Sequence, residues 1–204
     1  MELRSTYAVE KDQGGNMKKI GMVLLIIAGV VIVFGGMIIA GLNKPVILDE
    51  QVNSTWAQVE NQLQRRVDLI PNLVGTVKGY MEHERGTFEK ITELRSQWAK
   101  AAGAQEKIKT ANAITETLSK ILMVAENYPE LKANENFLNL QAQLEGTENR
   151  IAVERMRYND AVKTFNAYQR TIFGSVFCGL RGLSRPRVYF KAVEGAREAP
   201  KVIF

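Results

Sequence analysis

Two arginines and an aspartate stand just before a proline, and this group is the first candidate for chemistry. Arg65, Arg66 and Asp68 precede Pro71 and Asn72. A proline inside a helix removes one backbone donor and clashes one turn back, and Asn72 could satisfy the groups it frees. Either arginine could pair with an acidic group on the last long helix, Glu148 or Glu154. The group therefore predicts either a stabilising polar cluster or a binding site.

The last long helix carries further polar side chains at positions where apolar ones are expected. Glu148 and Arg155 would face water, form a buried network or line a ligand site, and buried charges need partners. Aromatic and polar side chains recur further along this helix, at Tyr158, Asn159, Asp160 and Asn166. We expect them to line the core and to leave their polar groups to find hydrogen-bond partners. The predicted polar cluster comprises Arg65, Arg66, Asp68, Asn72, Glu148, Arg155, Tyr158 and Asn159.

Histidine and cysteine are too scarce for most other chemistry. The chain holds one histidine, His83, and one cysteine, Cys178, which excludes an internal disulfide and a multi-histidine metal site. His83 lies between Glu82 and Glu84, but adjacent helical side chains point about 100° apart and cannot converge on one ion. We therefore predict no catalytic residue, no metal, no cofactor and no enzymatic activity.

The elements that position these residues are predicted to be helices. Apolar residues recur three and four apart from residue 52 to residue 77, and Pro71 should kink this helix or end it at Ile70. Similar patterns predict helices over 88–102, over 108–125 before Pro129, and from Phe137 to Ile172 at spacings of seven. The fold class is all-α: an antiparallel bundle of about four helices after a transmembrane helix.

An uncharged apolar run precedes the bundle. Residues 20–42 span roughly 34 Å as a helix, enough for a hydrocarbon core of about 30 Å. The run is longer than the apolar part of a signal peptide, so we expect an uncleaved transmembrane helix. Lys18 and Lys19 precede it and Lys44 follows, which favours a cytoplasmic N-terminus with the bundle outside.

The end of the chain is basic, whereas the bundle is neutral. Residues 174–204 carry six basic and two acidic groups, within a formal net charge of +5 for the whole chain. The stretch 172–183 is apolar and precedes the basic residues. This tail would pack on the bundle or contact an anionic membrane surface. The residues predicted for lipid contact are Arg181, Arg185, Arg187 and Lys191.

Three separated blocks resemble the LemA family of bacterial membrane proteins. They are RRVDLIPNLVGTVKGYMEHE (65–84), YPELKANENFLNLQAQLEGTENRIAVERMRYNDAVKTFN (128–166) and REAPKVIF (197–204). The chain departs from the family pattern at Gly174, where a proline is usual. The resemblance implies a helical bundle anchored by a single helix in the bacterial inner membrane, with the short N-terminus outside. That orientation opposes the one favoured by the flanking charges, and the resemblance implies no established activity.

These observations predict four parts: a short N-terminal tail (1–19, with Met17 as an alternative start), a transmembrane helix (20–42), a helical bundle (43–173) and a basic C-terminal tail (174–204). The expected function is that of a membrane-anchored scaffold or interaction protein. Its expected partners are the lipid bilayer and a protein or a second copy, without nucleic acid or a small-molecule substrate. The alternative is a lipid-binding or membrane-remodelling element that acts through the basic tail.

Overall fold

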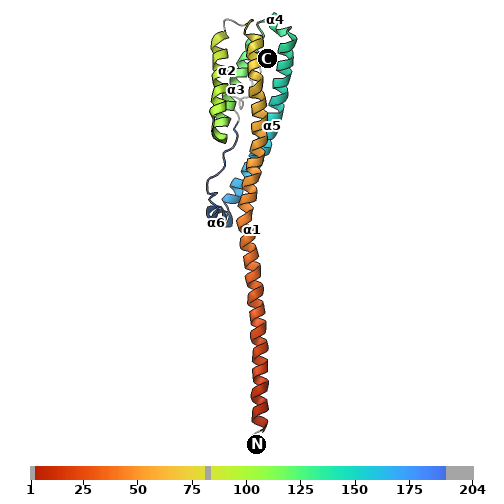
Figure 1. Cartoon of the computed structure of the whole chain (residues 1–204), viewed down its shortest axis with the longest axis vertical. Helices are drawn as coiled ribbons and strands as arrows, with labels where there is room; N and C mark the ends of the chain where they lie inside the picture. Colours follow the sequence, from red (N-terminus) through yellow and green to blue (C-terminus); the bar gives the residue numbers. More distant parts are fainter. Residues whose placement is uncertain (1–2, 81–83, 192–204) are drawn as a thin grey trace, which may run out of the picture. The chain divides into compact units, whose positions relative to one another are not determined.

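The computed structural model describes residues 3–80 and 84–191, and within these ranges the chain is helical without a strand. The helices are α1 (Leu3–Val77), α2 (Arg85–Lys100), α3 (Ala104–Ala125), α4 (Pro129–Lys132), α5 (Glu135–Gln169) and α6 (Ile172–Leu180) (Figure 1). The predicted all-α fold class is confirmed.

The chain divides into two compact units. Unit 1 comprises the chain up to Ile47 together with Gln169–Ser184, and unit 2 comprises Leu48–Tyr168 together with the chain from Arg185. Both α1 and α5 contribute residues to both units. The division of the chain into four functional parts stays a prediction.

Unit 2 is a helical bundle closed around an apolar core. The predicted stripe of α1 is buried at Val52, Val59, Leu63, Val67, Ile70 and Val77, and α5 contributes Phe137, Leu144, Ile151, Tyr158 and Phe165. Helix α2 packs against α3, and the short connection between them turns at Gly103, whose φ of 88° is the left-handed conformation that glycine adopts without strain. The side chains of α1 thus reach α2, α3 and α5 within one core.

Polar contacts join the same helices at the rim of the core. The Trp98 indole of α2 donates a hydrogen bond to Gln64 of α1 at 2.7 Å. Lys107 of α3 forms an ion pair with Glu60 of α1. The ring of Trp56 on α1 meets that of Tyr158 on α5 edge to face, with centroids 5.3 Å apart. The two tryptophans therefore join α1 to α2 and α5 through their ring contacts.

Two predicted boundaries differ from the structure. Helix α1 continues through Pro71 to Val77, so of the two predicted effects of the proline, a kink or an end at Ile70, the end is wrong. Leu73 and Val77 extend the buried stripe beyond the proline, and their burial outweighs the loss of one backbone hydrogen bond. The last long helix ends at Gln169, not at Ile172, and Ile172 begins α6 with its side chain exposed.

Unit 1 contains the apolar part of α1 and the short helix α6. The segment from Gly21 is long and apolar enough to cross a membrane by length and composition, and none of its most apolar window is buried. The contacts of α6 lie at the end of this apolar stretch, where Arg181 donates a hydrogen bond from Nε to the Leu42 carbonyl at 3.2 Å. Both helices of unit 1 are thus rich in exposed apolar side chains.

Candidate functional site

One arginine of the predicted group is buried and joins three helices. Arg66 lies on the inner face of α1. Its Nη1 donates a hydrogen bond to Glu148 Oε2 on α5 at 2.6 Å, and its Nη2 donates to the Ala111 carbonyl on α3 at 3.2 Å. The ion pair between Arg66 and Glu148 was one of the predicted pairings, and the structure confirms it.

The charges around Arg66 do not balance. The pKa of Arg66 is lowered, chiefly because the guanidinium is buried. The charge and hydrogen bond of Glu148 oppose this shift, and the positive charge of Arg155 adds to it. Burial also lowers the pKa of Arg155, and Glu148 opposes that shift. Arg155 stacks on the ring of Phe190, with its guanidinium carbon 4.4 Å from the centroid. We call Arg66, Glu148 and Arg155 the Arg66 cluster; it holds two cations and one anion.

The Arg66 cluster is built to hold helices together. The buried Arg66 Nε has no hydrogen-bond partner among the described residues, and Glu148 keeps 44% of its side chain exposed. A buried guanidinium with one partly hydrated carboxylate is a costly group, stabilised only while its partner is present. The cluster contains no nucleophile, and its hydrogen bonds support a structural role in which Arg66 joins α1 to α3 and α5.

The other members of the predicted group lie outside this cluster. Arg65, Asp68 and Asn72 are exposed. Asp68 accepts a hydrogen bond from Gln64 Nε2 at 2.8 Å. The Asn72 side chain makes no hydrogen bond within the described part of the chain, so its predicted role of compensating for Pro71 is wrong.

The remaining predicted polar residues of α5 hold an extended segment of the tail. Asn159 binds both backbone groups of Phe190: its Nδ2 donates to the carbonyl at 3.0 Å, and its Oδ1 accepts from the amide at 2.8 Å. Asn166 binds both backbone groups of Arg187 in the same way, at 2.9 and 2.8 Å. The Tyr158 hydroxyl donates to the carbonyl of Val188, which lies between Arg187 and Phe190 in the tail, at 2.8 Å.

We call Tyr158, Asn159 and Asn166 the amide clamp. Its spacing matches two different backbone periods. The two asparagines are seven positions apart, which is about 10.5 Å along α5. Arg187 and Phe190 are three positions apart, and three steps of an extended backbone cover about 10 Å. Because the two lengths agree, each asparagine meets both backbone groups of one tail residue, as a neighbouring strand would.

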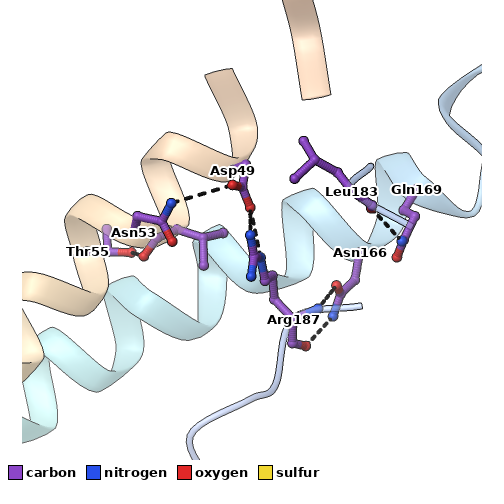
Figure 2. A network of polar contacts seen from close by, with 8 residues as sticks. Asp49, Asn53, Thr55, Asn166, Gln169, Leu183 and Arg187 are labelled. Carbon is purple, nitrogen blue, oxygen red and sulfur yellow. Dashed lines mark hydrogen bonds and ion pairs between the residues drawn. The ribbon is translucent and has the colours of Figure 1, made fainter. Parts of the chain in front are cut away.

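The side chain of Arg187 ties the same tail segment to α1. Figure 2 shows Arg187 between Asn166, which binds its backbone, and Asp49, which accepts hydrogen bonds from its guanidinium. The Nε of Arg187 lies 2.7 Å from Asp49 Oδ1. Burial raises the pKa of Tyr158, and the positive charge of Arg187 opposes that shift. The tail from Arg187 to Phe190 is therefore part of unit 2.

The four basic residues predicted for lipid contact have different surroundings. In unit 1, Arg181 donates hydrogen bonds to Leu42 and to Asn43 Oδ1, the latter at 3.4 Å. In unit 2, Arg187 binds Asp49, and the carbonyl of Lys191 accepts from Asn112 at 3.4 Å. The side chains of Arg181, Arg185 and Lys191 are exposed. Lipid contact by these residues stays a prediction, except that the charge of Arg187 is already paired.

Sequence reasoning missed Asp49 and the function of Asn166. The seven-residue spacing of Asn159 and Asn166 was a usable signal, but its partner lies in a segment without periodicity. His83 and the final block 197–204 lie outside the described residues. Cys178 is buried in α6, as expected for a small apolar side chain.

Comparisons with known proteins agree with this architecture. A family model described as LemA family matches residues 55–204, which include α2 to α6 and the amide clamp. The chain belongs to the LemA family. The bundle, the Arg66 cluster and the clamp therefore describe a LemA family domain.

Two curated relatives extend the comparison beyond the family model. They are the proteins named Magnetosome protein MamQ 1 and Magnetosome protein MamQ 2 of Paramagnetospirillum magneticum (strain ATCC 700264 / AMB-1). Each is 21% identical to this chain over 162 residues, which cover 67% of this chain and 60% of the relative. The alignment thus spans less than two thirds of the length of either relative.

Proposed function

We propose that this LemA family protein is anchored in the bacterial inner membrane by α1 and acts through contacts of its helical bundle, without catalysing a reaction. The observation that carries this proposal is the apolar part of α1. From Gly21 to Leu42 it holds no charged side chain, and no residue of its most apolar window is buried. In water such a surface would be unfavourable, whereas in a bilayer it is matched by its surroundings.

The core helix of a soluble protein and a signal peptide are also apolar. The core helix of a soluble protein is mostly buried, but no part of this window is. A signal peptide has an apolar region of about 7–15 residues, and the longer uncharged run of residues 20–42 supports a transmembrane helix over it. Membership of the LemA family and the similarity to the MamQ proteins support a membrane-associated helical protein.

The bundle is proposed to bind a protein partner or a second copy of this chain. Exposed apolar side chains are present on its outer faces, including Met123 on α3 and Leu138, Val153 and Met156 on α5. Single exposed apolar residues are common on soluble domains, so these positions are the places to test for contact. Cross-linking from Met123→Cys and Met156→Cys in intact membranes should capture one defined product. A ladder of unrelated products at both positions would oppose this function.

Membrane anchoring is tested by a charge in the apolar run. Ile32→Asp places a carboxylate where insertion scales assign about 3 kcal/mol of cost, and the variant should move from the membrane pellet to the soluble fraction or be degraded. The matched control is Asn53→Asp, which adds the same charge on an exposed face of the bundle part of α1. Equal membrane retention of both variants would oppose the anchor.

Orientation follows from the same reagents. The flanking lysines favour a bundle outside the cytoplasm, and the family resemblance favours a bundle inside it. Labelling of Met123→Cys in intact cells with a membrane-impermeant maleimide separates the two. Modification before lysis places the bundle outside, and modification only after lysis places it in the cytoplasm.

A further inference from the structure

Helix α6 presents an apolar face that nothing in the described structure covers. Its sequence, Ile172–Leu180, contains no charged residue. Four large apolar side chains are exposed: Ile172 at 83%, Phe173 at 74%, Val176 at 56% and Leu180 at 70%. Ile172, Val176 and Leu180 are four residues apart and Phe173 lies beside them, so the four share one side of the helix.

The opposite side of α6 is fastened to α1 within unit 1. Gly174 and Cys178 are buried, and Phe177 packs so closely on Gly41 that a Cβ there would lie 2.4 Å from the ring. Arg181, which follows the helix, donates hydrogen bonds to the Leu42 carbonyl and to Asn43. Helix α6 is therefore held at residues 41–43 of α1, with its apolar face left open.

The start of α6 is also specified by its own residues. The Thr171 hydroxyl accepts a hydrogen bond from the Gly174 amide at 3.0 Å, which caps the helix. A proline at 174 could not donate this bond. The backbone amide of residue 174 is thus required for this cap.

The position of the attachment decides what covers the open face. Gly41 and Leu42 end the apolar run, Asn43 follows it, and Lys44 is the first charge after it. In a membrane-anchored chain, this level of α1 is the boundary between hydrocarbon and headgroups. Nine residues of helix span about 14 Å, too short to cross a bilayer but suited to its interface.

We propose that α6 is an interfacial membrane helix, which inserts Ile172, Phe173, Val176 and Leu180 among lipid acyl chains while Arg181 faces the headgroups. This inference rests on the proposed anchoring by α1. The sequence predicted that the basic residues of the tail contact lipid. The present inference assigns the lipid contact to the apolar face of α6 instead.

A depth-sensitive probe on the full chain tests this inference. Single cysteines at Val176, Val30 and Met123 would be labelled with the fluorophore NBD in a Cys178→Ala background. The proteins would be reconstituted in vesicles of phosphatidylcholine and phosphatidylglycerol. Nitroxide-labelled lipid should quench the probes at Val176 and Val30 strongly, and leave the probe at the exposed Met123 of α3 unquenched.

The three positions separate the possible failures. Loss of quenching at Val30 would contradict the anchor itself. Quenching at Val30 without quenching at Val176 would overturn the interfacial helix while the anchor stands. If the Val176 probe were then also shielded from aqueous iodide, a protein surface such as a second copy would cover α6 instead of lipid.

A pair of glycine substitutions tests how α6 is held. Gly41→Leu would collide with Phe177, whereas a Cβ at Gly36 meets nothing within 4 Å and Gly36→Leu adds the same apolar side chain to the same run. Gly41→Leu should reduce lipid quenching at Val176, and Gly36→Leu should leave it unchanged. Equal quenching in both variants would contradict the role of the Gly41–Phe177 contact.

Discussion

The two halves of α1 share one backbone and have opposite surfaces. From Gly21 to Ile47 large apolar side chains point outward on every side, and Leu25 is 76% exposed. From Leu48 to Val77 apolar side chains form one buried stripe, and Leu63 is 1% exposed. A helix that is apolar all round requires an apolar environment, whereas an amphipathic helix requires a protein core.

Helical conformation in α1 therefore says little about what stabilises it. The second half is stabilised by side chains of α2, α3 and α5. Apart from the contact with α6 at residues 41–43, the first half depends on an apolar environment outside the described chain. Removing the same atoms from each half should therefore have different consequences.

The largest effect is expected for Leu63→Ala. Deleting a fully buried leucine loses its transfer free energy and leaves a cavity, which together cost about 2–5 kcal/mol. Leu25→Ala removes the same atoms from an exposed position and should leave the unfolding free energy of the bundle unchanged. Urea denaturation of both full-length variants in detergent, followed by circular dichroism, measures this difference. Equal destabilisation would mean that the two halves do not depend on different surroundings.

The Arg66 cluster provides the next largest effect. Glu148→Ala leaves the buried Arg66 guanidinium without its anion and should cost about 3 kcal/mol of unfolding free energy. Arg66→Met removes the cation, fills similar space with apolar atoms, and leaves a carboxylate that is 44% exposed and can be hydrated. It should therefore cost clearly less.

The double variant Arg66→Met with Glu148→Ala makes the test strict. It should be about as stable as Arg66→Met alone, because the uncompensated charge is then absent. A double variant whose loss equals the sum of the single losses would show that the ion pair does not couple the two positions.

The amide clamp should give smaller and more local effects. Asn159→Ala removes two hydrogen bonds to Phe190 and should cost about 1–2 kcal/mol. Hydrogen exchange at the Phe190 amide should become faster, while the Arg187 amide, which Asn166 holds, stays protected. Asn149→Ala, an exposed substitution on the same helix, is the control. Unchanged exchange at Phe190 in Asn159→Ala would contradict the clamp.

Much of this fold could be predicted because the core obeys helical periods. The stripe of α1 predicted most of its buried residues, and the seven-residue spacing of α5 predicted buried residues correctly from Phe137 to Phe165. The choice between a helix that continues past Pro71 and one that ends at Ile70 could not be predicted. The local cost of a proline is visible in a sequence, but the burial of Leu73 and Val77 that outweighs it is a property of the folded core.

The sites were less predictable than the core. The sequence predicted that Arg65 or Arg66 would pair with Glu148 or Glu154, and only the fold selects Arg66 and Glu148. The amide clamp did not follow, because an asparagine on a helix surface has the same pattern whether water or a backbone binds it. Likewise, Ile172 continues the spacing of α5 but faces outward, since Thr171 caps a new helix there.

The smallest effect concerns the tyrosine of the clamp. Tyr158→Phe deletes the hydrogen bond to the Val188 carbonyl and should cost about 1 kcal/mol of unfolding free energy.

The same substitution should change how stability depends on pH. Because burial raises the pKa of Tyr158 above its ordinary value of 10.0, the unfolded chain loses this proton before the folded chain does. The folded state then binds more protons, so this residue makes stability fall as the pH rises above about 10. Urea denaturation below and above that pH should show a shallower decline for Tyr158→Phe than for the unmodified chain. Parallel pH profiles would indicate that the Tyr158 hydroxyl reaches water and that the tail does not cover it.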